Sequence, residues 1–231
     1  MIAIQTTPVK LDDVRAQVRA TQAEHRDLID AFTQVYYRGH TWSMTMWLGV
    51  PMLKHPCDVW ALQDILYGLK PALIVETGTA YGGSALFMAN VCDCLGTGSV
   101  ITIDLEPGPN LPAHPRITYR VGNSVDPEIV GYVHERAARC GGPVVVILDS
   151  AHNQAHVANE LAAYASIVTP SSFLIVEDTN VNGHPVMPEH GPGPAEAVAD
   201  FLAAHPEFQA DALPERYLVT MHPGGWLRRV A

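Results

Sequence analysis

Acidic side chains follow two apolar segments in the second half of the chain. Asp149 closes the run 143–149, and Glu177 and Asp178 close the run 172–178. If both runs are parallel strands, their carboxyl ends meet at one edge of the sheet and the carboxylates converge there. A single acid at a strand end is as often a helix cap, but three neighbouring carboxylates repel one another unless a cation or proton compensates them. Oxygen ligands suit Mg²⁺, Mn²⁺ or Ca²⁺ better than zinc.

A histidine stands three residues after the first of these acids. His152 would lie beside the metal, where a neutral imidazole can take a proton from a hydroxyl, and His184 in a later loop is the reserve candidate. In the rival interpretation, His152 and His156 share one helix face and bind zinc. Residue 153 is Asn where a zinc peptidase helix has Glu. We therefore favour His152 as the catalytic base.

A glycine-rich turn follows an earlier apolar run, in the segment VETGTAYGGS at 75–84. Gly78 permits a tight turn, and the glycines at 82 and 83 let backbone approach a ligand where the next helix opens. The spacing is not that of a dinucleotide motif, and an acid precedes it. An acid can bind the ammonium group of an amino-acid ligand and the helix start can bind its carboxylate, which favours S-adenosylmethionine. The candidate residues are Glu76, Thr77, Gly78, Tyr81, Gly82, Gly83 and Ser84.

Asp104 ends the next apolar run, at 99–104. A carboxylate there can accept hydrogen bonds from both ribose hydroxyls of a nucleoside, although a cap or turn role is the alternative. Because Asp104 comes after the glycine turn, we favour the ribose role. Asp149 is expected to face the methyl donor as well as the metal.

Strand-like and helix-like segments alternate through most of the chain. The expected strands are 72–76, 99–104, 116–121, 143–149 and 172–177, and the expected helices are 11–37, 59–69, 84–94, 127–139, 152–164 and 194–204. This alternation predicts an α/β fold with a parallel sheet covered on both faces. The segments 217–222 and 226–230 flank Pro-Gly-Gly and predict a C-terminal antiparallel hairpin. We expect an N-terminal helical segment, 1–40, and one catalytic domain, 41–231.

Net charge, hydropathy and cysteine spacing limit the classes of partner and the location to be expected. The chain has 231 residues and a formal net charge of −10, which disfavours nucleic acid as a partner. No apolar run is long enough to span a membrane, and no targeting segment is visible. The four cysteines are spaced like ordinary reduced thiols. We therefore expect a cytoplasmic protein.

Six segments together resemble the cephalosporin hydroxylase family, which includes rhamnosyl O-methyltransferases. They are LGVPMLK (48–54), IVETGTAYGGSALF (74–87), VITIDLE (100–106), HPRITY (114–119), ILDSAH (147–152) and LIVEDTNVNGHPV (174–186). The resemblance implies a class I methyltransferase with a Rossmann-like, mostly parallel seven-stranded sheet. It also implies a metal held by Asp149, Glu177 and Asp178, a base at His152, adenine near Ser124, and a homo-oligomer.

The expected function is transfer of a methyl group from S-adenosylmethionine to a hydroxyl of a sugar or glycosylated natural product, with Mg²⁺ or Mn²⁺. The acceptor is thus a small molecule, and Trp42, Met44, Met46 and Trp47 could line its pocket or simply pack in the core. One alternative is an oxidoreductase or true hydroxylase, for which a two-histidine, one-carboxylate triad would be expected. A non-catalytic binding module is the other, and it should lack the acids and the base.

Overall fold

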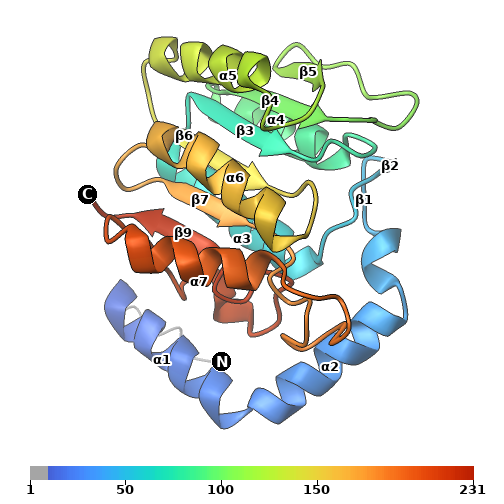
Figure 1. Ribbon diagram of the computed structural model, residues 1–231, viewed down its shortest axis with the longest axis vertical. Coiled ribbons are helices and arrows are strands. Elements are labelled where there is room, and N and C mark those ends of the chain that lie inside the picture. Colours follow the sequence, from blue (N-terminus) through green and yellow to red (C-terminus); the bar gives the residue numbers. More distant parts are fainter. Residues whose placement is uncertain (1–9) are drawn as a thin grey trace, which may run out of the picture.

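The computed structural model describes residues 10–231, which form a central sheet with helices on both sides (Figure 1). Seven strands lie in the order β5-β4-β3-β6-β7-β9-β8. They are β3 (Leu73–Thr77), β4 (Ser99–Asp104), β5 (Ile117–Val121), β6 (Val144–Leu148), β7 (Phe173–Val176), β8 (Phe208–Ala210) and β9 (Trp226–Arg229). The first five are parallel, whereas β9 is antiparallel to both β7 and β8. The expected α/β class and sheet are confirmed.

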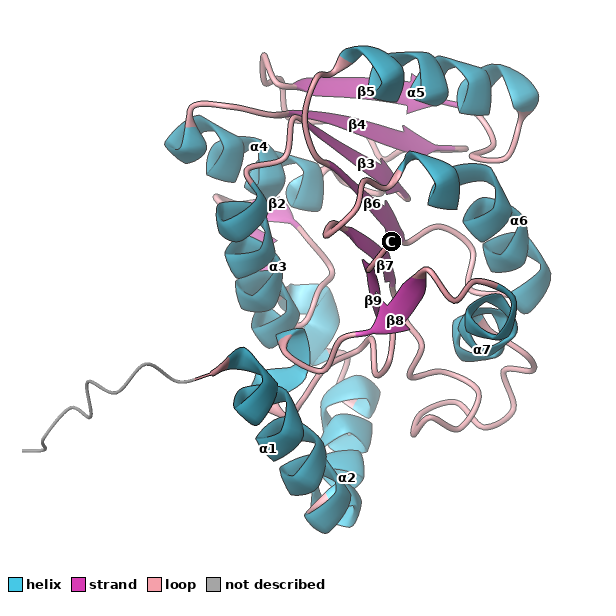
Figure 2. Ribbon diagram, turned by 90° about the vertical axis from the view of Figure 1, so that its left-hand side faces the viewer, coloured by secondary structure: helices cyan, strands magenta, loops and turns pink. Residues whose placement is uncertain are grey.

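Helices cover the two faces of this sheet in separate groups (Figure 2). α3 (Pro56–Leu69) and α4 (Gly83–Leu95) lie on one face; α5 (Pro127–Arg139), α6 (Gln154–Tyr164) and α7 (Pro194–Ala204) lie on the other. Alternate strand residues serve the two cores: on β3, Leu73 and Val75 pack with α5 and α6, and Ile74 packs with α3 and α4. Because both faces are buried, the inner strands β6 and β7 consist entirely of apolar residues.

The N-terminal region differs from the single helix expected over 11–37. It forms α1 (Leu11–Glu24) and α2 (Arg26–Arg38), with a break at His25. Arg15 ties α1 to the C-terminal part through two hydrogen bonds to Asp211, of 2.7 and 2.8 Å. A short 3₁₀ turn, Thr41–Met44, and two two-residue strands, β1 (Met46–Trp47) and β2 (Val50–Pro51), connect α2 to α3. None of the helices within 10–231 combines the length and apolarity needed to cross a membrane.

The expected strand at 217–222 is not formed. A 3₁₀ helix, Pro214–Tyr217, leads instead into a buried loop, and β9 takes β7 and β8 as its antiparallel partners. The reason lies in the polar bonds of this loop: the Met221 N–H donates to Asp58, and the His222 ring accepts from the Asp178 N–H. These contacts draw the loop beneath the acidic strand ends.

Candidate active site

The carboxyl ends of β6 and β7 bring the first group of predicted residues together. Asp149, His152 and Asp178 each offer a ligand atom, and these atoms all lie within 4.8 Å of one another. His152 Nε2 is 3.1 Å from Asp178 Oδ2 and 3.7 Å from Asp149 Oδ1. Since β6 and β7 are neighbours in the sheet, the strand-end argument placed these residues side by side as expected.

Glu177 lies beside this group but points to two basic side chains that were not predicted, Lys54 and His222. Its Oε1 is 2.5 Å from Lys54 Nζ, which also lies 2.9 Å from Asp149 Oδ2. Its Oε2 is 3.5 Å from His222 Nε2. Lys54 carries a signal in the sequence, as the only charged residue of the segment LGVPMLK, but His222 was hidden inside the segment predicted to be a strand.

Burial and charge shift the pKa values of the acids in opposite directions. Burial alone would raise the pKa of Asp149, but Lys54 and His152 outweigh it and lower the pKa to about 2. Burial and the Asp149 charge raise the pKa of Glu177 to about 7 despite Lys54. Burial also raises the pKa of Asp178. The cluster therefore resists carrying its full negative charge, which is the behaviour of a site suited to a cation.

The basic groups respond to the same carboxylates. Burial would lower the pKa of His152, but Asp178 and Asp149 outweigh it and raise the pKa to about 9. Burial would also lower the pKa of Lys54, but the charges of Asp149 and Glu177 outweigh it and raise that pKa. His152 is thus held as a cation while the carboxylate charges are uncompensated. It becomes a proton acceptor at neutral pH only when another cation takes over that compensation.

The glycines of the loop between β3 and α4 allow close approach of other backbone segments. A Cβ on Gly78, which has φ +90°, would lie 1.9 Å from the carbonyl oxygen of Asp149. A Cβ on Gly83 would lie 2.2 Å from the carbonyl oxygen of Pro51. The sequence interpretation assigned the space at Gly82 and Gly83 to a ligand. In the structure, a Cβ on Gly82 would meet Pro112 at 3.0 Å, whereas Gly83 packs against Pro51 and also lines a cavity, as does Ser84.

Asp104 holds this loop from the end of β4. Its Oδ2 accepts hydrogen bonds from the N–H groups of Thr79 and Ala80, at 2.9 and 2.8 Å. Its Oδ1 accepts one from the Glu106 N–H. A carboxylate has about four lone-pair positions, so capacity remains for a further donor. Asp104 also lines a cavity, and the turn role and the ribose role are compatible.

Four of the predicted cofactor residues, Gly82 among them, do not line the cavities at this edge. Glu76 is fully buried, with Oε2 accepting from Thr102 at 2.7 Å, and burial raises its pKa to about 7 although Lys54 opposes the shift. Thr77 is also buried, in β3, where its carbonyl oxygen accepts from the Asp149 N–H. Tyr81 is 44% exposed and packs on Gly108. Glu76 thus lies behind the glycine turn rather than in the open.

A cavity of about 460 Å³ lies where β3, β4, β5 and β6 end. Its lining includes Gly78, Ala80, Asp104, Ser124, Asp149, Ser150 and His156. The fully buried Glu160 accepts from Ser124 Oγ at 2.5 Å and from Ser150 Oγ at 2.7 Å. His156 Nε2 lies 3.1 Å from Ser124 Oγ. This volume is in the range of small-molecule sites.

The zinc interpretation of the two histidines does not fit this geometry. α6 begins at Gln154, capped by Asn153, so His152 precedes the helix and does not share a face with His156. His156 contacts Ser124 and Glu160, whereas His152 contacts Asp178. The histidines therefore belong to two different sites.

A second, smaller cavity, of about 190 Å³, is lined by Asp149, His152 and Asp178, which together are called the reactive group below. It shares Gly78, Ala80, Asp149 and Ser150 with the first cavity and adds Tyr37, Trp42, Met52, His152 and Asp178. Tyr37 and Trp42 also line an outer groove of about 690 Å³ with residues 185–189. Of the four candidate wall residues, Trp42 alone lines this space among the described residues. Trp47 packs on Phe87 with ring centroids 5.0 Å apart, and Met44 and Met46 are exposed.

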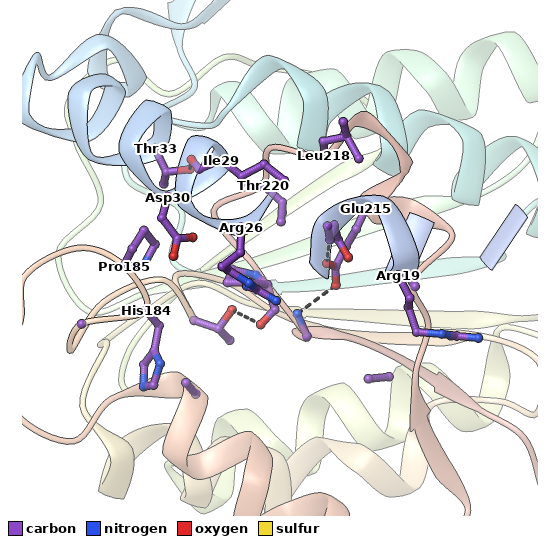
Figure 3. Close-up of a pocket in the computed structure, with 18 residues that line it drawn as sticks. Arg19, Arg26, Ile29, Asp30, Thr33, His184, Pro185, Glu215, Leu218 and Thr220 are labelled. Atoms are coloured by element: carbon purple, nitrogen blue, oxygen red, sulfur yellow. Dashed lines mark hydrogen bonds between the residues drawn. The ribbon is translucent and has the colours of Figure 1, made fainter. Parts of the chain in front are cut away.

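A further cavity, of about 510 Å³, lies between the N-terminal helices and the C-terminal loops (Figure 3). Arg19, Arg26 and Asp30 face it from the helices, and His184 faces it from the loop after β7. His184 Nε2 lies 2.9 Å from Glu196 Oε1. The reserve base therefore lines a different cavity from the one that contains Asp149 and Asp178.

Comparisons with known proteins agree with this architecture. Residues 39–230 match the model of the family described as rhamnosyl O-methyltransferase/CmcI. The rhamnosyl O-methyltransferase of Mycobacterium tuberculosis strain H37Rv is 34% identical over 200 residues, covering 84% of this chain and 82% of the relative. The Mycobacterium leprae enzyme of the same name is 33% identical over 207 residues, covering 87% and 90%.

Solved structures give the same result. A structure of CmcI with magnesium and S-adenosylmethionine has a TM-score of 0.63 and 26% identity, covering 82% of this chain and 78% of that one. The hydroxylase alternative is not favoured, because the metal-ligand group among the described residues contains one histidine and two carboxylates rather than two histidines. The chain belongs to the rhamnosyl O-methyltransferase/CmcI family, and it is an S-adenosylmethionine-dependent O-methyltransferase.

Proposed function

We propose that this enzyme methylates a hydroxyl of a sugar or glycosylated small molecule, with Mg²⁺ or Mn²⁺ bound beside the acceptor. The observation that carries the proposal is the convergence of Asp149, His152 and Asp178 in a cavity that adjoins the larger one along the Gly78 loop. The rhamnosyl O-methyltransferases among its relatives support a sugar as the acceptor.

The residues fit both groups that this chemistry requires. The 460 Å³ cavity offers Asp104 for ribose hydroxyls and Ser124 with His156 near a base, and S-adenosylmethionine bound there would supply the methyl group. Asp149 and Asp178 would hold the divalent ion, with Glu177 on the adjoining side. An ion bound there would polarise the acceptor hydroxyl and lower its pKa.

His152 would remove the proton of the acceptor hydroxyl. Its side chain lines the small cavity, and its Nε2 lies 3.1 Å from Asp178 Oδ2. Asp149 forms part of the wall of both cavities, so it fixes where acceptor and donor meet. Holding both in one geometry contributes much of the rate of a transfer between two substrates.

The outer groove supports an acceptor larger than a single sugar. Tyr37 and Trp42 stand between the groove and the reactive group, with ring centroids 5.9 Å apart. A sugar at the metal could therefore extend past these rings into the groove. The expected homo-oligomer stays a prediction, and the exposed apolar side chains Leu28, Phe32 and Val35 of α2 support it.

The decisive experiment uses p-nitrophenyl α-L-rhamnoside as the acceptor and follows methyl transfer by mass spectrometry. Chelator should abolish turnover and added Mg²⁺ or Mn²⁺ should restore it. His152→Ala should reduce turnover by about 10²–10⁴, the usual effect of removing a general base, while S-adenosylhomocysteine affinity is unchanged.

His152→Gln is the matched control, because it keeps a polar side chain but provides no base at neutral pH. It should be as inactive as His152→Ala. A folded His152→Gln enzyme that turns over near the wild-type rate would exclude His152 as the base, and full activity in excess chelator would exclude the metal.

A further inference from the structure

Lys54 lies in the interior of the metal-ligand cluster. Its residue exposure is 3%, and its Nζ donates to Asp149 Oδ2 at 2.9 Å and to Glu177 Oε1 at 2.5 Å. A buried ammonium is costly unless it is paired, so this lysine depends on both carboxylates. The acids were predicted to be metal ligands, yet two of them already share a cation that belongs to the chain.

The backbone around Lys54 is held so that its side chain enters the cluster. Leu53 has φ +58°, an uncommon conformation for a residue with a branched side chain. Before it, Pro51 and Met52 lie against Gly83 so closely that a Cβ there would be 2.2 and 2.9 Å from their backbone atoms. After it, His55 caps α3, and its ring accepts from the Cys57 N–H at 3.2 Å. Both sides of Lys54 are therefore fixed.

The charges of the cluster add up to a specific value. In the metal-bound state of the proposed function His152 is neutral, so Asp149, Glu177 and Asp178 carry −3 when ionised, Lys54 carries +1, and −2 is left. A divalent ion compensates this charge completely. Without the lysine, the same ion would face an excess negative charge. Charges a few ångströms apart interact strongly even where partial solvation screens them.

We propose that Lys54 is a resident cation of the metal site, which lowers the attraction of the carboxylates for a divalent ion and so sets metal affinity. This inference rests on the proposed function, because it takes the acids to be metal ligands. Lys54 is a positioning residue: it acts through Asp149 and Glu177, and contact with either substrate is not required.

The test is calorimetric titration of Mg²⁺ into the full chain without acceptor, with thermal melting in the presence and absence of Mg²⁺. Lys54→Met should bind Mg²⁺ at least about tenfold more tightly than wild type and gain more melting temperature from it, because an opposing charge has been removed. Lys54→Arg keeps the charge and should stay within about threefold of wild type. Lys10→Met, at an exposed lysine, should match wild type.

Lys54→Met exposes the acids to one another and could unfold in the absence of metal, so a second background keeps the test decisive. Lys54→Met combined with Glu177→Gln removes one positive and one negative charge, and should bind Mg²⁺ about tenfold more tightly than Glu177→Gln alone. Equal or weaker binding in both comparisons would overturn the role of Lys54. Absence of Mg²⁺ binding by wild type would instead contradict the proposed function.

Discussion

The cofactor cavity and the metal cluster share one edge of the sheet, but different kinds of segment build them. The cavity is formed mainly by turns that directly follow β3, β4, β5 and β6, so all its lining residues except His156 of α6 stand in or next to a strand in the sequence. The metal cluster begins in the same way, with Asp149 and Asp178. It is then completed by Lys54 and His222, which lie 95 residues before Asp149 and 44 residues after Asp178. Side chains from distant segments of the chain therefore complete a site that the strand ends form only in part.

The largest effect should come from the metal cluster itself. Asp178→Asn removes a charge but keeps a residue type that tolerates the φ of +54° found here. We expect kcat/KM to fall by about 10³, since losing electrostatic stabilisation of several kcal/mol costs about a decade per 1.4 kcal/mol. S-adenosylhomocysteine affinity, measured by calorimetry without metal, should change less than about threefold. A comparable loss of kcat/KM and of S-adenosylhomocysteine affinity would mean that the metal cluster and the cofactor cavity do not act separately.

His222 should affect the metal cluster without affecting the cofactor cavity. Its Nδ1 accepts from the Asp178 N–H at 3.1 Å, and its Nε2 faces Glu177 and Asp58. Removing such a supporting group typically costs about 10–100-fold in metal affinity, which we expect for His222→Ala. His222→Asn retains an acceptor and should lose less. If alanine and asparagine are equally impaired, the bond to Asp178 is not what matters.

Glu160 provides the opposite test, on the cofactor side. Glu160→Ala would leave the hydroxyls of Ser124 and Ser150 without their shared acceptor. Unsatisfied buried groups cost about 1–3 kcal/mol, so S-adenosylhomocysteine should bind about tenfold more weakly. Mg²⁺ affinity measured without S-adenosylhomocysteine should be unchanged, and Glu160→Gln should recover part of the loss. If only the Mg²⁺ affinity changed, Glu160 would act on the metal cluster and not on the cofactor cavity.

The smallest effect concerns the tie between α1 and the C-terminal segment. Burial would raise the pKa of Asp211, but its bonds to Arg15 and to the Leu213 N–H lower it below the unfolded value. A lowered folded pKa gives stability that is present above about pH 4 and is lost as the pH falls through the folded value. Arg15→Gln should thus reduce the melting temperature by about 2–4 °C at pH 7.

That difference between Arg15→Gln and wild type should shrink as thermal melts are taken from pH 7 toward pH 3. A gap that stays constant with pH would show that Arg15 contributes through packing, not through the Asp211 charge. Turnover at pH 7 should be unaffected, because α1 does not line either cavity at the strand ends.

The sequence was most informative where function follows the strand pattern. Asp104, Asp149 and Asp178 end apolar runs, so their convergence follows from a parallel sheet alone. His222 could not be found in this way, because the segment 217–222 precedes Pro-Gly-Gly like one strand of a hairpin, whereas its polar bonds to Asp58 and Asp178 keep it a loop. Gly83 lines the small cavity, but it also has a packing role that the sequence could not show. Its need for space comes from Pro51, a partner that only the tertiary fold brings near.

The contact between Gly78 and the Asp149 carbonyl has a thermodynamic consequence. The turn that faces the methyl donor rests on the backbone of a metal-cluster residue, with no room for even one added carbon. A shift of either segment must therefore be shared by the other. Any free energy by which the donor alters metal binding has to appear, equal in size, as an effect of the metal on donor binding. The saturation curve of each would then depend on the concentration of the other, and product release would be sensitive to the metal level.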